Sequence, residues 1–287
     1  MPSGLPCPDA GGGAGGAGNG GAGQVNPNAI TPRTGGAVTD VFNPVHARSA
    51  SDVWAVGSTG TGVGTSTLAE HWDGSAWKVI PTLSPGGSSA FPSLRGVTAT
   101  SATDAWAVGF TSLTSGVTTL AEHWNGTAWS VVTSPSPGFF NELFAVDARS
   151  ATDVWAVGET LANNASSTQP LIEHWNGTSW IQVPGPSLPA GGVLKSVSAT
   201  SAKNAWAAGL SEDPATGGDR PLIEHWNGTS WTVATSDTAG AGAQLGAVAA
   251  TSASSAWAVG AATFPTSGAG TFIERWNGSA WKEVASP

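Results

Sequence analysis

The sequence predicts an all-β protein: a five-bladed β-propeller made of four-stranded antiparallel blades. All 15 tryptophans fall into three sets of five, with steps of 49 to 52 residues within each set. Each repeat holds four short segments rich in Val, Trp and Thr, bounded by Gly, Pro, Ser and Asn, which is typical of strands joined by turns. No segment has helical apolar periodicity over about ten residues. Four strands in a repeat of about 50 residues describe a propeller blade.

The tryptophan sets define the repeat boundaries. The sets are Trp54, Trp106, Trp155, Trp206, Trp257; Trp72, Trp124, Trp175, Trp226, Trp276; and Trp77, Trp129, Trp180, Trp231, Trp281. The predicted repeats span approximately 42–90, 91–140, 141–190, 191–241 and 242–287, inside a propeller domain of 39–287. In the second repeat the predicted strands are 94–99, 105–110, 119–124 and 127–132. We expect a closed ring in which the fifth blade packs on the first.

The last two strands of each repeat are joined by Asn-Gly, or by Asp73-Gly74 in the first repeat. This dipeptide is the strongest short hairpin signal, because a two-residue type I′ turn needs positive φ at both positions. In the second repeat such a turn places Glu122 opposite Trp129. Glu122, Trp124 and Trp129 then share one face of the hairpin, and His123 lies on the other.

Residues 1–38 differ in composition from the repeats. Positions 11–23 read GGGAGGAGNGGAG and follow a proline-rich start. Such a stretch has almost no apolar side chain to bury, which predicts a flexible glycine-rich and proline-rich tail or linker. Glycine-dense chains also pack closely as extended threads, so ordering by another chain is the alternative.

The repeat resembles a known family. The segment Asp104-Ala-Trp-Ala-Val-Gly109, followed by Leu120-Ala-Glu-His-Trp-Asn-Gly-Thr-Ala-Trp129, is similar to a kelch repeat, and the similarity extends over about 245 of the 287 residues. The sequence departs from the kelch pattern in having a single glycine where two are usual, and Trp-Asn in place of Tyr-Asp. Five blades also resemble the tachylectin type of sugar-binding propeller, without matching motifs. Kelch-like propellers include copper radical oxidases, but the tyrosine that their chemistry requires is absent here.

Composition excludes several classes of function. Ten basic residues and a net charge of −9 cannot present a broad phosphate-binding surface, so we expect no nucleic-acid partner. One cysteine excludes a disulfide framework and a multi-thiolate zinc site, and we expect no metal or cofactor. No apolar run is long enough to cross a membrane. The start, Met1-Pro2-Ser3-Gly4, shows no signal peptide.

A Glu-His pair precedes a tryptophan in four repeats, and Glu274-Arg275 replaces it in the fifth. Adjacent strand residues point to opposite faces, so the pair cannot converge on one substrate atom. A periodic pair also suits packing better than an asymmetric active site does. We therefore expect each glutamate to accept hydrogen bonds from a neighbouring blade or an indole N–H, and we predict no catalytic residues and no enzyme. An enzyme with an unrecognised asymmetric site is the minor alternative.

The candidate ligand-binding residues are those that depart from the repeat. His46, Arg48, Asp147 and Arg149 lie on the variable face of the first strands, which line the central channel of a propeller. They predict either an anion or sugar site, or a cluster that is solvated or internally paired. Variable loops form one rim and short turns the other, and binding usually resides in variable loops. Phe139 and Phe140, in one such loop, are an exposed contact pair or are tucked beneath it.

Five asparagines begin an Asn-X-Ser/Thr sequence and are candidate glycosylation sites: Asn125, Asn164, Asn176, Asn227 and Asn277. The alternative for the four that precede glycine is turn chemistry alone. We expect an extracellular or cell-surface location, although no signal peptide is visible.

The function expected from the sequence is that of a structural or interaction module without catalysis, self-assembling through the glycine-rich tail. Its partners would be other copies of itself or another protein. The alternative is a carbohydrate-binding lectin that uses the variable loop rim and takes glycans.

Overall fold

A computed structural model describes residues 39–60, 64–87, 90–236, 242–264 and 268–286 of the chain. These residues belong to one compact unit, Thr34–Pro287. The glycine-rich tail, on which the prediction of self-assembly depends, lies outside the described residues. Nothing helical in the described part is long and apolar enough to cross a membrane.

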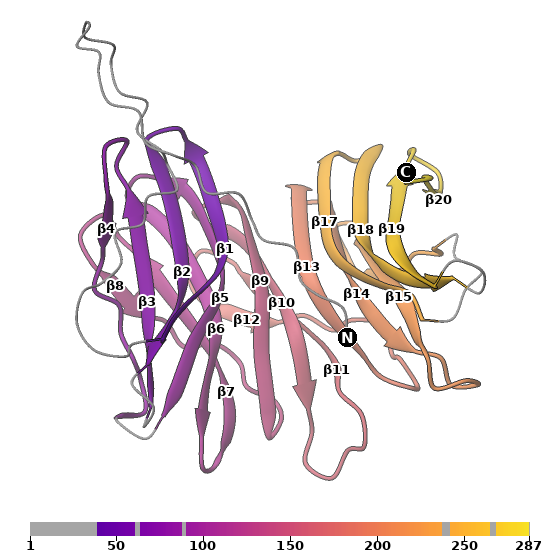
Figure 1. Cartoon of the computed structure of the whole chain (residues 1–287), viewed down its shortest axis with the longest axis horizontal. Helices are drawn as coiled ribbons and strands as arrows, with labels where there is room; N and C mark the ends of the chain where they lie inside the picture. Colours follow the sequence, from indigo (N-terminus) through magenta and orange to yellow (C-terminus); the bar gives the residue numbers. More distant parts are fainter. Residues whose placement is uncertain (1–38, 61–63, 88–89, 237–241, 265–267, 287) are drawn as a thin grey trace, which may run out of the picture. The chain divides into compact units, whose positions relative to one another are not determined.

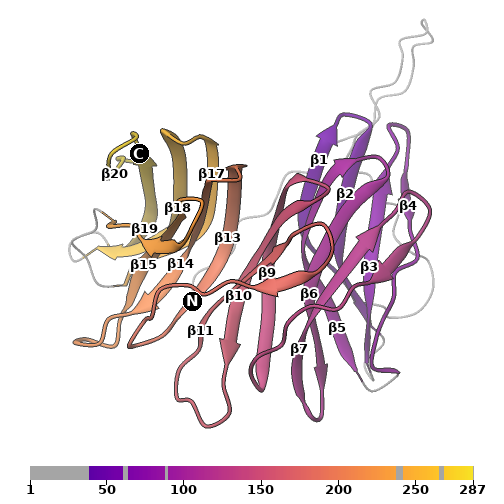
Figure 2. The same ribbon diagram turned by 180° about the vertical axis from the view of Figure 1, so that it is seen from behind.

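The described residues form five four-stranded antiparallel sheets, each built from four consecutive strands in chain order (Figures 1 and 2). The protein is a five-bladed β-propeller, as the sequence predicts. The first blade holds β1 (Thr39–Ser49), β2 (Asp52–Gly60), β3 (Thr65–Trp72) and β4 (Trp77–Val79). The second holds β5 (Phe91–Ser101), β6 (Asp104–Leu113), β7 (Gly116–Trp124) and β8 (Trp129–Val131). The third holds β9 (Phe140–Ser150), β10 (Asp153–Leu161), β11 (Gln169–Trp175) and β12 (Trp180–Gln182). The fourth holds β13 (Gly192–Ser201), β14 (Asn204–Glu212), β15 (Asp219–Trp226) and β16 (Trp231–Val233). The fifth holds β17 (Gln244–Ser252), β18 (Ser255–Phe264), β19 (Gly268–Trp276) and β20 (Trp281–Glu283).

One glycine in the second strand of every blade lies against an irregularity in the first strand. In the third blade the register of β9 with β10 shifts between Val157 and Gly158, and Gly158 pairs with Leu143. A Cβ at Gly158 would lie 1.9 Å from the carbonyl oxygen of Glu142. The equivalent glycines, each 1.9 Å from a first-strand carbonyl oxygen, are Gly57, Gly109, Gly209 and Gly260. The single glycine of the repeat is therefore required by close backbone approach.

The hairpin between the third and fourth strands differs from its prediction. Trp124 pairs with Trp129 and Glu122 with Val131, so the connection has four residues instead of two. Gly126 has a φ of +93°, whereas Asn125 is not in the left-handed region. Asn125 Oδ1 instead accepts hydrogen bonds from the N–H groups of Thr127 (2.9 Å) and Ala128 (3.0 Å). The prediction of a type I′ turn was wrong, because the asparagine side chain closes a longer turn.

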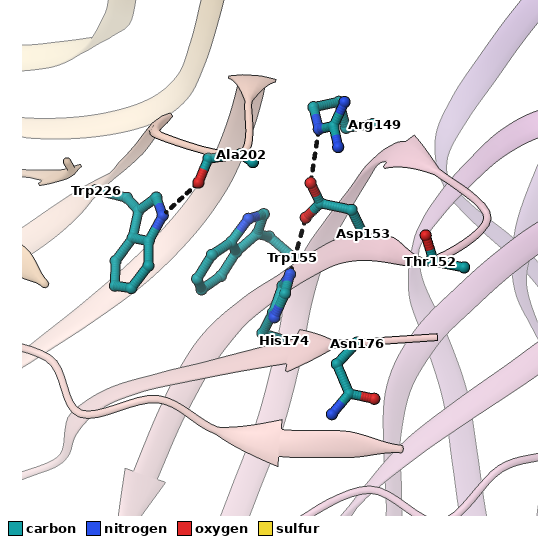
Figure 3. A pocket seen from close by; sticks show the side chains of 8 residues that line it. All are labelled: Arg149, Thr152, Asp153, Trp155, His174, Asn176, Ala202 and Trp226. Atoms are coloured by element: carbon teal, nitrogen blue, oxygen red, sulfur yellow. Dashed lines mark hydrogen bonds and ion pairs between the residues drawn. The ribbon is translucent and has the colours of Figure 1, made fainter. Parts of the chain in front are cut away.

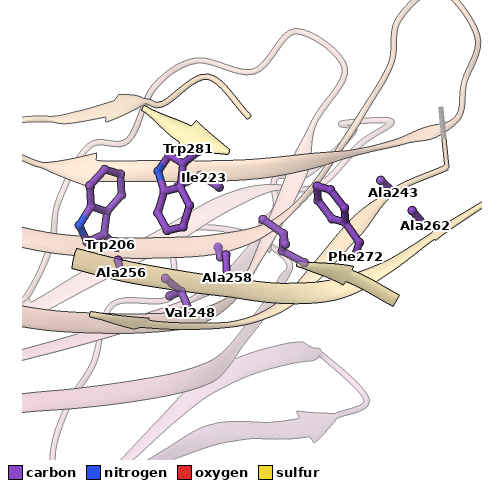
Figure 4. Packing of buried hydrophobic residues seen from close by; sticks show 11 residues of the cluster. Trp206, Ile223, Ala243, Val248, Ala256, Ala258, Ala262, Phe272 and Trp281 are labelled. Atoms are coloured by element: carbon purple, nitrogen blue, oxygen red, sulfur yellow. The ribbon is translucent and has the colours of Figure 1, made fainter. Parts of the chain in front are cut away.

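Consecutive blades pack through two distinct faces, which we call outgoing and incoming. The outgoing face carries the second-strand tryptophan and meets the next blade; the incoming face carries the fourth-strand tryptophan and meets the preceding one. At the junction of blades four and five, Trp206 of one blade contacts Trp281 of the next edge-on, with 5.1 Å between ring centroids (Figure 4). Ile223 and Phe272 belong to the same core cluster. The three preceding junctions repeat this pattern.

The junction of the fifth blade with the first was predicted to complete the ring. The four hydrophobic core clusters found among the described residues lie at the four junctions between consecutive blades, and none of them joins blade five to blade one. On the outgoing face of the fifth blade, Trp257 and Val259 are exposed, whereas Ala55, Leu68 and Glu70 on the incoming face of the first blade are buried.

Candidate functional site

A pocket of about 280 Å³ lies between the third and fourth blades (Figure 3). It opens on the rim formed by the short turns, at the opposite ends of the strands from the variable loops. Eight residues line it: Arg149, Thr152, Asp153, Trp155, His174, Asn176, Ala202 and Trp226. Two of them, Arg149 and Asn176, are among the candidate site residues named from the sequence; the other six were not predicted to belong to a site.

Asp153 is the centre of the polar part of the pocket. It is the first residue of β10, next to the tight turn that follows β9, and its side chain is largely buried. Arg149 Nε donates to Asp153 Oδ2 at 2.6 Å, and His174 Nε2 lies 2.8 Å from Asp153 Oδ1. An ionised carboxylate only accepts, so His174 carries its proton on Nε2. Figure 3 shows the three side chains joined in this order.

Arg149 and His174 stabilise the ionised form of Asp153. Burial alone would raise the pKa of Asp153, but the hydrogen bonds from His174 and Arg149 and their charges outweigh it, so the pKa lies below its ordinary value. The contact to Asp153 uses one of the five N–H donors of Arg149. The pocket thus contains a fixed hydrogen-bond acceptor, Asp153, and further N–H donors on Arg149.

Two tryptophans form the apolar wall. Trp155 pairs with His174 across β10 and β11, and their rings lie 4.3 Å apart at 32°. Trp226, from the fourth blade, contacts Trp155 with 5.0 Å between centroids. Its Nε1 donates to the carbonyl of Ala202 at 3.1 Å, which fixes the indole at the edge of the pocket. The fourth blade therefore contributes a rigid aromatic surface to the pocket.

The Asp153–His174 pair of the pocket has equivalents in other blades, and the residue types at its two positions change together. Asp52 pairs with His71 and Asp104 with His123, while in the fourth blade Asn204 replaces the aspartate beside His225. In the fifth blade both partners change, to Ser255 and Arg275. This correlation between repeats was a signal in the sequence that the Glu-His interpretation overlooked. Arg48 contacts Asp52 as Arg149 contacts Asp153.

The first-strand residues predicted to share one channel site do not form a single cluster. Arg48 and Arg149 each pair with an aspartate of their own blade. Asp147 Oδ2 accepts a hydrogen bond from the N–H of Ala199 at 2.7 Å, which ties the third blade to the fourth. Burial raises the pKa of Asp147, and the charge of His46 opposes that rise. His46 and Asp147 are therefore close enough to interact electrostatically.

The predicted loop contacts and modification sites lie elsewhere. Phe139 is exposed and Phe140 half-buried, and neither lines the pocket. All five candidate glycosylation asparagines are exposed. In Asn125, Asn176, Asn227 and Asn277, Oδ1 accepts backbone N–H bonds within the turn. Asn164 has a φ of +65°.

The repeated glutamates lie on the incoming faces, and three of them accept hydrogen bonds from the connection between blades, as predicted. Ser134 Oγ donates to Glu173, and Ser236 Oγ donates to Glu274 at 2.9 Å. Glu122 accepts from the N–H of Leu83 at 3.3 Å. Burial raises the pKa of Glu122 to about 7 and that of Glu173 to about 8, despite these bonds. These buried carboxyl groups lie between consecutive blades, where they help to join one blade to the connection before it.

Glu224 is the exception among them. It is fully buried, and neither carboxylate oxygen has a hydrogen-bond partner among the described residues. Gly185 stands five residues after Trp180, where Ser134 and Ser236 stand in their repeats, so the serine hydroxyl is missing. Burial raises the pKa of Glu224 to about 8.

Replacing Gly185 by serine is expected to stabilise the protein. A Cβ at this position would lie 3.5 Å from Glu224 Oε2 and 3.3 Å from the flexible end of Ile172. The new hydroxyl can then donate to Glu224 and raise the free energy of unfolding by about 1 kcal/mol. Urea unfolding at neutral pH measures this. Gly246→Ser, at an exposed position, serves as the control, and equal effects of the two substitutions would contradict the role of the hydroxyl.

Within the described ranges, no group of three or more His, Cys, Asp or Glu side chains is arranged to hold a metal ion. The polar residues of the pocket instead satisfy one another, as their distances show.

Neither a protein-family model nor a curated protein matches the chain. Solved structures do match, at low sequence identity. YCF48 bound to a D1 peptide has a TM-score of 0.50 and 16% identity, covering 88% of this chain and 70% of YCF48. An ulvan lyase, a polysaccharide lyase, has a TM-score of 0.55 and 9% identity, covering 86% and 66%. A protein of unknown function from Dyadobacter fermentans has a TM-score of 0.52 and 10% identity, covering 87% of each chain. These likenesses concern the fold.

The prediction that the chain is not an enzyme is contradicted by this comparison. A polysaccharide lyase has a similar fold, so a propeller of this kind is no ground for excluding catalysis. The prediction rested on the periodicity of the Glu-His pairs, and periodic packing residues say nothing about what the non-periodic positions do. The comparison does not test the resemblance to kelch repeats.

Proposed function

We propose that this chain is an extracellular interaction module that binds a neutral saccharide in the pocket between the third and fourth blades. One observation carries the proposal: a fixed acceptor, several donors and an aromatic wall meet in a single recess of the propeller rim. Binding sites of this kind combine an apolar lining with a few placed polar groups.

The chemistry of a sugar suits this lining. A pyranose has hydroxyl groups that donate and accept, and an apolar face of C–H groups. Asp153 offers an acceptor, and Arg149 and the amide nitrogen of Asn176 offer donors; Asn176 Oδ1 already accepts the N–H groups of Thr178 and Ser179. The indole of Trp226, fixed by its bond to Ala202, suits the apolar face.

Charge favours a neutral ligand over a polyanion. The chain carries a net charge of −9, and Arg149 already faces the carboxylate of Asp153. A polyanionic saccharide would meet long-range repulsion and little uncompensated positive charge. A neutral saccharide meets neither obstacle.

The first test is binding of the whole chain to an array of neutral and anionic oligosaccharides, followed by calorimetric titration of the tightest neutral binder. Arg149→Ala is expected to weaken binding at least about tenfold, because a hydrogen bond to a charged group contributes about 1.5–3 kcal/mol. Failure to retain any neutral oligosaccharide would overturn the proposal.

Arg220→Ala is the matched control. Arg220 also forms an ion pair, with Asp213 at 2.6 Å, but it lies on β15 beside the variable connection that follows β14, on the other rim. We expect its replacement to leave the affinity unchanged. A larger loss from Arg220→Ala than from Arg149→Ala would move the site to the variable loops, as the sequence alone suggested.

A further inference from the structure

The polar side chains that Figure 3 shows in the pocket occur a second time, where the first blade meets the second. Arg48 Nε donates to Asp52 Oδ2 at 2.7 Å, and His71 Nε2 lies 2.9 Å from Asp52 Oδ1. The corresponding distances in the pocket are 2.6 and 2.8 Å. The side chain of Arg48 is 38% exposed and that of Arg149 is 39% exposed. Both guanidinium groups are therefore held in the same way and are equally accessible.

The aromatic wall of the pocket is repeated at the same junction. Trp54 lies against His71 with 4.4 Å between ring centroids, and Trp124 of the second blade contacts Trp54 at 5.3 Å. Trp124 Nε1 donates to the carbonyl of Ala102 at 3.1 Å, the same distance as for its equivalent in the pocket. The first junction thus has a fixed indole beside a fixed acceptor and an accessible guanidinium.

The other two junctions keep the tryptophans but lack the arginine. Threonine stands at this position in the second and fourth blades, as Thr100 and Thr200. Thr100 Oγ1 donates its one proton to Asp104, so it has no further donor. In the fourth blade the carboxylate is also replaced, and Asn204 Nδ2 donates to Thr200 Oγ1 at 2.7 Å. Of the four junctions, those after the first and third blades therefore combine a carboxylate with a guanidinium.

One position differs between the two arginine-bearing junctions without changing their net charge. Asp73 stands where Asn176 stands in the third blade, and its Oδ2 pairs with Lys78 Nζ at 2.5 Å. The ammonium of Lys78 supplies N–H donors in place of the amide. The Arg48–Asp52 and Asp73–Lys78 pairs cancel in formal charge, as the single ion pair of the pocket does. The same uncharged class of ligand therefore suits both junctions.

We propose that the junction of the first and second blades is a second binding site for a neutral saccharide, so that each chain binds two. The inference rests on the proposed function of the pocket between the third and fourth blades. Arg48 and Arg149 each stand four residues before the end of the short turn, at the aspartate that begins the second strand, so both sites lie on the same rim. Two sites on one rim can engage one polysaccharide or glycan-bearing surface together, which raises the overall avidity.

The test is calorimetric titration of the whole chain with a neutral disaccharide that the array identifies, because a short ligand occupies one site at a time. The unsubstituted chain should bind two molecules. Arg48→Ala and Arg149→Ala should each bind one at the original affinity, and the tenfold loss expected from Arg149→Ala then concerns one site of the two. Both arginines are exposed, and the site that each variant retains shows that it is folded. The double variant should bind at both sites at least about tenfold more weakly.

Thr100→Ala is the matched control, since it changes the same strand position at a junction without the arginine. It should still bind two molecules. A loss of one molecule in this control, or more than two in the unsubstituted chain, would overturn the assignment of the sites to the arginine-bearing junctions.

The titration also separates this inference from the proposed function. One molecule per chain, bound normally by Arg48→Ala and weakly by Arg149→Ala, would overturn the second site and support the pocket alone. The absence of binding to any neutral saccharide would overturn both.

Discussion

Replacing Gly158 by alanine is expected to lower the free energy of unfolding by about 3 kcal/mol or more. The new Cβ would lie 1.9 Å from the carbonyl oxygen of Glu142 and 2.8 Å from the Cα of Leu143. Both are main-chain atoms of β9, so relief requires displacement of the strand that the third blade uses to contact its neighbours. Urea unfolding at fixed pH measures the loss.

Gly246→Ala is the matched control for this substitution. Gly246 also lies in a propeller strand, but the nearest atom to its added Cβ is 3.9 Å away, an ordinary contact. Its replacement should change the free energy of unfolding by about 0.5 kcal/mol or less. Equal losses from the two variants would mean that strand glycines matter here for flexibility and not for close approach.

The second large effect is a fall in stability as the pH rises from about 5 to about 9. Burial raises the pKa of Glu122 to about 7 and the pKa values of Glu173 and Glu224 to about 8, from an ordinary 4.5. Between these limits the folded chain binds more protons than the unfolded chain, so the free energy of unfolding declines with pH. The contribution of these glutamates to the free energy of unfolding is complete below about pH 4.5. It is lost once the pH exceeds their pKa values in the folded chain, about 7 and about 8. A shift of about three units corresponds to about 4 kcal/mol.

The acid side of the profile has the opposite sign. The pKa of Asp153 lies below its ordinary value because its hydrogen bonds and neighbouring charges outweigh burial, so its contribution is lost as the pH falls below about 4. Stability should therefore be greatest near pH 4 to 5. The midpoint of urea unfolding, followed across the pH range, measures both limbs.

Glu224→Gln should flatten the decline at high pH by removing one of the three groups. Glu283→Gln, on the exposed outer strand of the fifth blade, should leave the profile unchanged. A profile that is flat from pH 5 to 9 in the unsubstituted chain would contradict the assignment of these glutamates as buried acids.

The blades were predictable because their determinants are local and occur five times. Strand composition, turn residues and the tryptophan spacing all indicated the same unit. The hairpin register was not predictable from Asn-Gly alone, because the side chain of Asn125 bonds the N–H groups of Thr127 and Ala128 and so stabilises a longer turn. A dipeptide rule describes backbone preference and omits this competing bond.

The candidate site was predicted only in part. Arg149 and Asn176 were identified because they depart from the repeat or match a modification sequence. Asp153 and Trp226 lie at repeated positions, and they become a site only where two blades meet, a contact between residues more than 70 positions apart. The exposure of Trp257 and Val259 on the fifth blade was not foreseen either, since a repeat unit indicates what each junction contains and not whether the last one forms within the chain.

The uniform junctions have a consequence for how such chains change over generations. Each sheet is built from one complete repeat, and each junction joins the same two kinds of surface. Unequal recombination between repeats would therefore add or delete a whole blade without requiring any compensating substitution. The number of blades is therefore the property of this architecture that is easiest to change. The second-strand glycine of each blade is among the hardest to replace, because a Cβ there would clash with the first strand.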